Sequence, residues 1–205
     1  MRINKFLSSL GIASRRAIDK YIEEGRIKVN GVIASTGIDV TEEDEIYIDN
    51  KKIETNRIEE KVYFMLNKPL EVLSASSDDR GRKTVVDLIK TDKRIFPIGR
   101  LDYMTSGLIL LTNDGELFNR LVHPKSEIFK KYYIKVFGEV KKEEIEELKK
   151  GVLLEDGKTL PAKVSGIKYD KNKTSMYISI REGRNRQIRR MIEKFGYKVL
   201  MLRRE

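Results

Sequence analysis

The chain has 205 residues, of which 40% are hydrophobic and 36% are charged, so it can bury a core beneath a very polar surface. Its formal net charge of +10 suits a polyanionic partner, and nucleic acid fits better than membrane because no stretch approaches ~20 apolar residues. The chain has no cysteine and one histidine, which excludes disulfides and thiolate or histidine-based zinc sites.

Residues 1–53 predict two short helices followed by a small β-ribbon. Apolar side chains at helical spacing indicate a first helix that ends at Gly11 and a second that Ser14 caps and Gly25 ends. Alternating apolar residues then predict strands at 26–30 and 45–49, with Asn30–Gly31 as a hairpin turn.

Positive charge is concentrated on these two helices. Residues 1–31 carry seven Lys or Arg and three Asp or Glu, whereas residues 32–58 carry three and seven. Such charges are usually a solvated helix face, but the helix dipole disfavours Arg15 and Arg16 at a helix start, which favours a functional role. The candidates for contact with RNA phosphates are Lys5, Arg15, Arg16, Lys20, Arg26 and Lys28.

The first unit resembles a known RNA-binding module. Ser-Arg-Arg at 14–16 and Ile-Glu-Glu-Gly-Arg-Ile-Lys-Val-Asn-Gly at 22–31 resemble ribosomal-protein-S-four-like domains, and the resemblance covers about residues 1–53. We place the domain boundary between residues 58 and 59, within a polar segment. Residues 1–58 then form an RNA-binding domain and residues 59–205 a second domain.

The second domain mixes predicted strands and helices without a strict βαβ rhythm. We therefore expect an α+β domain with a mixed, mainly antiparallel sheet and flanking helices. The predicted strands are 62–66, 108–111, 132–137, 162–168 and 176–180, with a strand-like segment at 198–202. The predicted helices are 85–89, 116–121, 142–149 and 186–195.

Asp102 lies in the most informative stretch, 97–115, which reads Pro-Ile-Gly-Arg-Leu-Asp-Tyr-Met-Thr-Ser-Gly-Leu-Ile-Leu-Leu-Thr-Asn-Asp-Gly. Alone, an aspartate in a polar loop is most often a turn residue. Arg100 supplies positive charge nearby. The whole string resembles the catalytic signature of the RNA pseudouridine synthases, closest to the branch that modifies ribosomal RNA. The resemblance puts the catalytic carboxylate at Asp102, as nucleophile or as base at the ribose.

Lys130-Lys131-Tyr132 resembles the family's basic-x-Tyr motif. The resemblance implies that Tyr132 stacks on the target base and assists proton removal at carbon-5. By itself, a tyrosine in a strand is more often part of the core.

Residues 182–191, Glu-Gly-Arg-Asn-Arg-Gln-Ile-Arg-Arg-Met, resemble the family's third motif. This implies that Arg189 pairs with the catalytic aspartate and that Ile188 packs under the tyrosine. Arg184 and Arg186 are then available for RNA phosphates. Without the resemblance, the cluster is a generic basic patch that indicates nucleic acid and no more.

The resemblance implies a cleft across the sheet and site-specific isomerisation of uridine to pseudouridine in ribosomal RNA, with base flipping. It implies no metal and no cofactor, because the reaction neither gains nor loses atoms or electrons. We expect ribosomal RNA as partner, no obligate protein partner, and a cytoplasmic monomer.

One alternative is a non-catalytic RNA-binding or ribosome-assembly factor on the same fold, which the intact trio Asp102, Tyr132 and Arg189 disfavours. Another is a nuclease or other base-modifying enzyme, which the lack of a metal or thiol constellation disfavours. Family members continue for a few more strands and turns after the position of Glu205, including a Gly-Leu segment that closes the domain, and this sequence leaves open whether the natural chain does the same.

Overall fold

The computed structural model describes residues 1–56 and 59–205, which form two compact units. Unit 1 contains residues 1–62 with the short segments 91–94 and 113–115, and unit 2 contains the remainder. The predicted boundary adjoins residues 57 and 58, which lie outside the described residues, and it stays a prediction.

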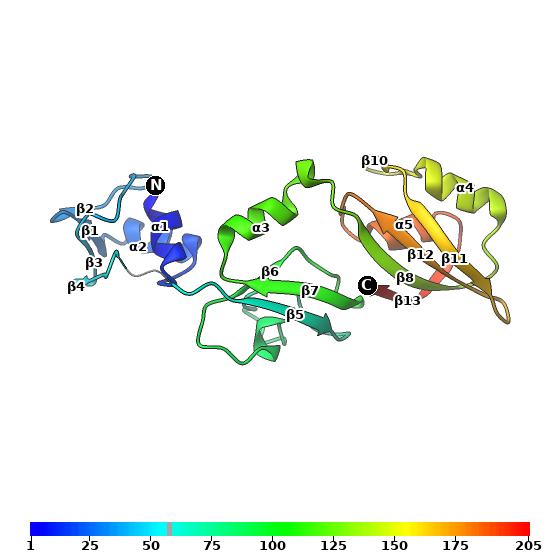
Figure 1. Ribbon diagram of the computed structural model, residues 1–205, viewed down its shortest axis with the longest axis horizontal. Coiled ribbons are helices and arrows are strands. Elements are labelled where there is room, and N and C mark those ends of the chain that lie inside the picture. Colours follow the sequence, from blue (N-terminus) through cyan, green and yellow to red (C-terminus); the bar gives the residue numbers. More distant parts are fainter. Residues whose placement is uncertain (57–58) are drawn as a thin grey trace. The chain divides into compact units, whose positions relative to one another are not determined.

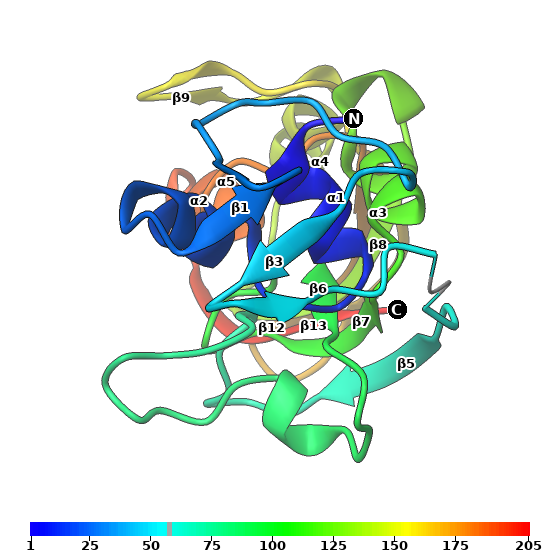
Figure 2. The same ribbon diagram turned by 90° about the vertical axis from the view of Figure 1, so that its left-hand side faces the viewer.

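Unit 1 consists of two helices and a small sheet (Figure 2). Ser14 caps the second helix by accepting a hydrogen bond from the Ala17 amide at 3.0 Å. Asn30 and Gly31 have φ values of 50° and 82°, the positive values that a two-residue hairpin requires. The helices are α1 (Ile3–Ser9) and α2 (Arg15–Glu23), and the sheet order is β2 (Val32–Ile33), β1 (Ile27–Val29), β3 (Ile46–Ile48), β4 (Lys51–Lys52). The predicted helices, cap and hairpin turn are confirmed.

Unit 2 is built on a mixed sheet (Figure 1). Its order is β11 (Lys163–Tyr169), β12 (Lys173–Ile180), β8 (Lys130–Phe137), β13 (Lys198–Arg204), β7 (Ser106–Thr112), β5 (Tyr63–Lys68), and β6 (Phe96–Ile98) also pairs with β7. In the described residues, only β13 and β7 run parallel, and the other neighbours are antiparallel. The predicted α+β class with a mainly antiparallel sheet is confirmed.

Helices and a small ribbon complete unit 2. The helices are α4 (Lys142–Lys150), which lies against β11, α5 (Gln187–Glu193), which lies against β13, and α3 (Gly115–Val122). The ribbon is β9 (Leu153–Leu154) with β10 (Gly157–Lys158), and two 3-10 turns are η1 (Val86–Leu88) and η2 (Pro124–Ser126).

Two predictions about these elements need correction. The helix expected at 85–89 is the single 3-10 turn η1, because the segment is too short to nucleate an α-helix and begins with two β-branched valines. The strand β6 was not predicted, since it contains Pro97, and it pairs with β7 alone.

The main core of unit 2 lies on one face of the sheet. Along β12, buried and half-buried residues alternate with period two, so one face is covered and the other is open. Met176 and Ile178 on the covered face join Ile134 and Val136 of β8 and the buried side of α5. This packing sets the position of α5 and of the arginine-rich turn that precedes it.

Candidate active site

A cavity of about 660 Å³ opens in unit 2 beside the loop that carries Asp102. The volume falls in the range of small-molecule sites and can accept a single nucleotide. The predicted residues on its walls are Arg100, Asp102, Tyr132, Arg184, Arg186 and Ile188. Segments far apart in the sequence thus bring the three predicted motifs to one place.

The Asp102 loop is fixed through its backbone. Ser74 accepts a hydrogen bond from the Leu101 amide at 3.0 Å and donates one to the Leu101 carbonyl at 2.9 Å. The Thr105 amide donates to the Asp102 carbonyl at 3.0 Å, which closes a tight turn. The half-buried Asp102 side chain is therefore held at the cavity wall by a rigid frame.

Lys68 is fully buried and supports the same loop. Its Nζ donates to the carbonyls of Pro69 at 2.9 Å and Val72 at 2.8 Å, and it reaches the Tyr103 carbonyl at 3.5 Å. Burial lowers the pKa of Lys68, and the nearby Asp102 carboxylate raises it. This ammonium group was missed from the sequence, where the one signal was a lysine between strand and proline in Asn67-Lys68-Pro69.

Arg189 is buried and contacts the Asp102 loop rather than the carboxylate itself. Its Nη2 donates to the Met104 carbonyl at 2.5 Å and approaches the Thr105 hydroxyl at 3.4 Å. In the described ranges, no ion pair within 4.0 Å joins Arg189 to Asp102, so the predicted pairing is not seen in this conformation. The charge of Asp102 still raises the pKa of Arg189 against a larger lowering by burial, and the buried Nε has no hydrogen-bond partner.

Tyr132 is half-buried on β8, directly opposite Ile178 of β12 and Arg204 of β13. Burial raises the pKa of Tyr132, the Arg204 guanidinium lowers it, and the Asp102 carboxylate raises it further. Ile188 and Leu202 are buried in the cluster against which Tyr132 packs. The Tyr132 ring therefore lies against an apolar cluster and close to charged groups, and its packing on Ile188 stays a prediction.

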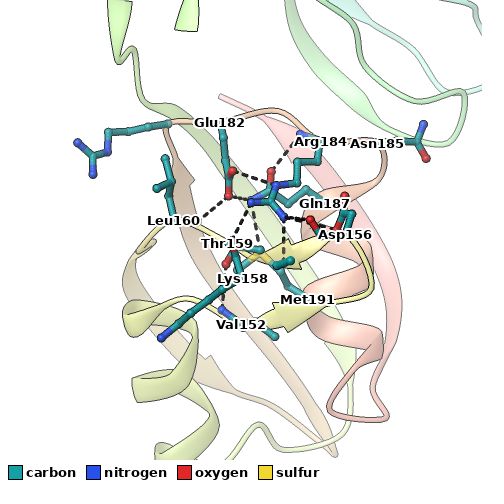
Figure 3. A network of polar contacts seen from close by, with 12 residues as sticks. Val152, Asp156, Lys158, Thr159, Leu160, Glu182, Arg184, Asn185, Gln187 and Met191 are labelled. Atoms are coloured by element: carbon teal, nitrogen blue, oxygen red, sulfur yellow. Dashed lines mark hydrogen bonds and ion pairs between the residues drawn. The ribbon is translucent and has the colours of Figure 1, made fainter. Parts of the chain in front are cut away.

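Arg184 is not a free cation, because its guanidinium is bonded to groups within the protein, and its contact with RNA phosphates stays a prediction (Figure 3). Its Nε pairs with Glu182 at 3.1 Å, and its terminal nitrogens donate to the carbonyls of Gly157 at 3.0 Å and Lys158 at 2.7 Å. Its donors are directed inward at the β9–β10 ribbon, so they serve the fold.

Arg190 of α5 and Glu182 of the turn before it also hold the β9–β10 ribbon in place. Arg190 forms a two-point ion pair with Asp156, with both distances at 2.9 Å, and this pair lowers the pKa of Asp156. Glu182 accepts hydrogen bonds from the Leu160 amide at 2.8 Å and the Gln187 side chain at 2.6 Å (Figure 3). Sequence reasoning missed Asp156 as the acidic partner of the arginine cluster.

Arg100 and Arg186 present cationic groups at the cavity. Arg100 is exposed. Arg186 has a side chain 46% exposed and only a loose ion pair with Glu193 at 3.7 Å. These side chains remain accessible to the phosphates of a bound RNA strand.

In unit 1 the predicted basic residues divide into two groups. Lys5, Arg15 and Arg16 are exposed on α1 and α2, and Lys28 is exposed with a long contact to Asn50 at 3.4 Å. Arg26 instead donates twice to Asp49, at 2.8 and 2.6 Å, so its guanidinium serves the fold.

Residues 1–56 and 59–205 contain no group of three or more His, Cys, Asp or Glu that could hold a metal ion. Over the same ranges, no helix is long and apolar enough to cross a membrane.

Comparison with known proteins agrees with the fold. The family model of RNA pseudouridylate synthases matches residues 62–194, and that of the S4 domain matches residues 1–46. The chain is 50% identical over 208 residues to ribosomal large subunit pseudouridine synthase B of Bacillus subtilis, which covers 100% of this chain and 84% of the relative. It is 38% identical over 205 residues to a dual-specificity RNA pseudouridine synthase of Escherichia coli, covering 100% of this chain and 69% of the relative.

A crystal structure of a pseudouridylate synthase matches with a TM-score of 0.67 and 32% identity, over 100% of this chain and 87% of that chain. The chain therefore belongs to the RNA pseudouridylate synthase family. It is an RNA pseudouridine synthase whose N-terminal part is an S4 domain.

Proposed function

We propose that this enzyme isomerises a specific uridine of ribosomal RNA to pseudouridine, with Asp102 as the catalytic carboxylate. The observation that carries the proposal is the cavity itself, which gathers Asp102, Tyr132 and the exposed Arg100 around a space for one nucleotide. Relatives that match the whole chain are named for action on RNA, and the B. subtilis relative for the large ribosomal subunit.

The reaction exchanges one glycosidic bond for another. The bond from uracil N1 to ribose C1′ breaks, a bond from C5 to C1′ forms, and one proton moves from C5 to N1. Asp102 acts on the ribose, as nucleophile or as base, and it must be ionised for either role. Two buried cations, Lys68 and Arg189, contact the loop that carries this carboxylate.

Tyr132 acts on the uracil ring of the target uridine. A uridine inside a folded RNA has to leave its stack to reach Asp102, and stacking on an aromatic ring compensates ~1–3 kcal/mol of that cost. The ring packs against the apolar cluster that includes Ile188 and Leu202. Its oxygen, as the phenolate, is the group that takes the C5 proton once the new bond has formed.

Arg189 completes the proposed site. Its buried Nε lacks a partner, so a small rotation of Asp102 toward it on substrate binding would supply one. We place the S4-like RNA-binding domain at residues 1–58 and the catalytic domain at 59–205. RNA phosphates are then bound by Arg100 and Arg186 and, in unit 1, by Lys5, Arg15, Arg16 and Lys28.

The test is incubation of the purified protein with ribosomal RNA transcribed with uridine tritiated at C5. Pseudouridine formation releases that tritium to water, and mapping the product identifies the uridine. Release without a metal or cofactor in the buffer supports the proposal. RNA binding without release would instead support the non-catalytic RNA-binding alternative.

A further inference from the structure

Arg204 lies at the site although no motif in the sequence pointed to it. It is directly opposite Tyr132 in the register of β13 and β8, and directly opposite Gly107 in that of β13 and β7. Directly opposed residues of neighbouring strands share a sheet face. Arg204 and Tyr132 both line the Asp102 cavity.

Gly107 lets Arg204 come this close. Gly107 has a φ of +108°, and a Cβ there would lie 2.1 Å from the Arg204 carbonyl oxygen and 2.5 Å from its amide nitrogen. Any other residue would push β13 away from the strand that follows the Asp102 loop. The Arg204 Nε then donates to the Leu108 carbonyl at 2.6 Å. This bond fixes the guanidinium and leaves the N–H groups of the two terminal nitrogens for other acceptors.

The charge of Arg204 acts on the groups around the tyrosine ring. It lowers the pKa of Tyr132, against the larger raising by burial and a smaller raising by Asp102. It also adds to the lowering that burial imposes on the pKa of Lys130. Asp102 and Arg204 are thus the charged groups that shift the pKa of the Tyr132 phenol, in addition to burial.

We propose that Arg204 is a positioning residue for Tyr132, which holds the phenol oxygen in place and stabilises the negative charge that it carries as a base. The inference rests on the proposed function. After the C5–C1′ bond has formed, the C5–H bond breaks and its proton goes to the phenolate oxygen. The C5–H electron pair forms the C5=C6 double bond, which moves the N1=C6 electrons to N1, and N1 takes a proton from water. The phenol afterwards returns its proton to water.

The test compares Arg204→Gln, Arg204→Lys and Arg203→Gln. Arg203 is the matched control because it is adjacent, opposes Tyr133 rather than Tyr132, and pairs with Glu205 at 2.8 Å. Each variant is measured in single turnover on ribosomal RNA transcribed with uridine or 5-deuterouridine, with RNA affinity measured separately.

For Arg204→Gln we expect a rate lower by ~10–100-fold, with the RNA Kd within ~3-fold of wild type. The C5 deuterium isotope effect should increase, and the rate should rise at higher pH than in wild type. Arg204→Lys, which keeps the charge, should recover part of the rate. Arg203→Gln should match wild type.

The inference is overturned if Arg204→Gln loses no more rate than Arg203→Gln, if the loss is only in RNA affinity, or if the isotope effect is unchanged. If Arg204→Gln does not fold, Arg204→Lys is used in its place. An isotope effect and a pH profile of Arg204→Lys that are both unchanged from wild type then overturn the inference. An inactive wild type contradicts the proposed function. An active wild type with a normal Arg204→Gln contradicts this inference alone.

Discussion

The Nζ of Lys68 lies 3.5 Å from the carbonyl oxygen of Tyr103, so a fully buried ammonium group contacts the residue that follows Asp102. The same nitrogen is bonded to two further carbonyls, of Pro69 and Val72. The end of β5 and the Asp102 loop therefore share one cation. Stability and activity should depend on it together.

Replacing Lys68 by Met should lower both the free energy of unfolding and the rate of pseudouridine formation. Met fills much of the volume but leaves the carbonyl of the buried Val72 without a donor, which costs ~1–3 kcal/mol, and it removes the donor from the Pro69 carbonyl as well. Urea unfolding should therefore show a loss of a few kcal/mol, and single-turnover rates should fall. Lys83→Met, at an exposed site, is the control. A Lys68→Met protein as stable as the control would show that the buried contacts are not needed.

Arg184 and Arg186 should behave differently although they are two residues apart. Arg184→Gln removes a clamp on the β9–β10 ribbon, so we expect a loss of ~1–3 kcal/mol in unfolding free energy. Arg186→Gln should leave stability within ~0.5 kcal/mol and weaken RNA binding, because its side chain is exposed. Urea unfolding and RNA titration of both variants test this division. The reverse pattern, in which Arg184→Gln weakens RNA binding and leaves stability unchanged, would show that Arg184 contacts RNA.

The exposed arginines of α2 should contribute to the salt dependence of RNA binding. Each single-strand phosphate contact adds about −0.7 to the slope of log K against log salt concentration. The double variant with Arg15→Ala and Arg16→Ala should make that slope shallower by the amount that corresponds to one or two phosphate contacts. Lys51→Ala, exposed on β4 in the acidic half of unit 1, is the control. If the slope does not change, α2 makes no contact with RNA.

Asp78 gives a prediction in pH. Hydrogen bonds from Arg82 lower its pKa from 3.8 to about 2. Between about pH 2 and pH 4 the unfolded chain binds more protons at Asp78 than the folded chain does. The stabilisation that the Asp78–Arg82 pair contributes is therefore complete above about pH 4 and is lost as the pH falls to about 2. The stability difference between wild type and Asp78→Asn should close over this range. A constant difference for Asp78→Asn would contradict the prediction.

Local signals predicted much of the fold. Ser14 and Gly25 determine the limits of α2, and Asn30–Gly31 determines a hairpin, because a cap or a positive φ depends on residues next to each other in the chain. The Asp102 loop could be located in the same way. Local reasoning failed at 85–89, where one turn of apolar residues is equally compatible with a 3-10 turn.

Partners distant in the sequence could not be predicted. Arg184 looked like a free cation because its acceptors, the carbonyls of Gly157 and Lys158, carry no sequence signal. Lys68 and Arg204 become site residues only when β5 and β13 are placed beside β7. The family motif suggested that Arg189 faces Asp102, whereas in this conformation its Nη2 binds the Met104 carbonyl.

Asp102→Asn is the most direct measurement of the central proposal. The amide has the same shape but can act neither as nucleophile nor as base, so tritium release from C5-labelled ribosomal RNA should fall by at least ~10³-fold. The RNA Kd should stay within ~3-fold of wild type, and Asp92→Asn, at an exposed position, should leave both unchanged. Near-normal turnover by Asp102→Asn would remove this carboxylate from the mechanism and contradict the account.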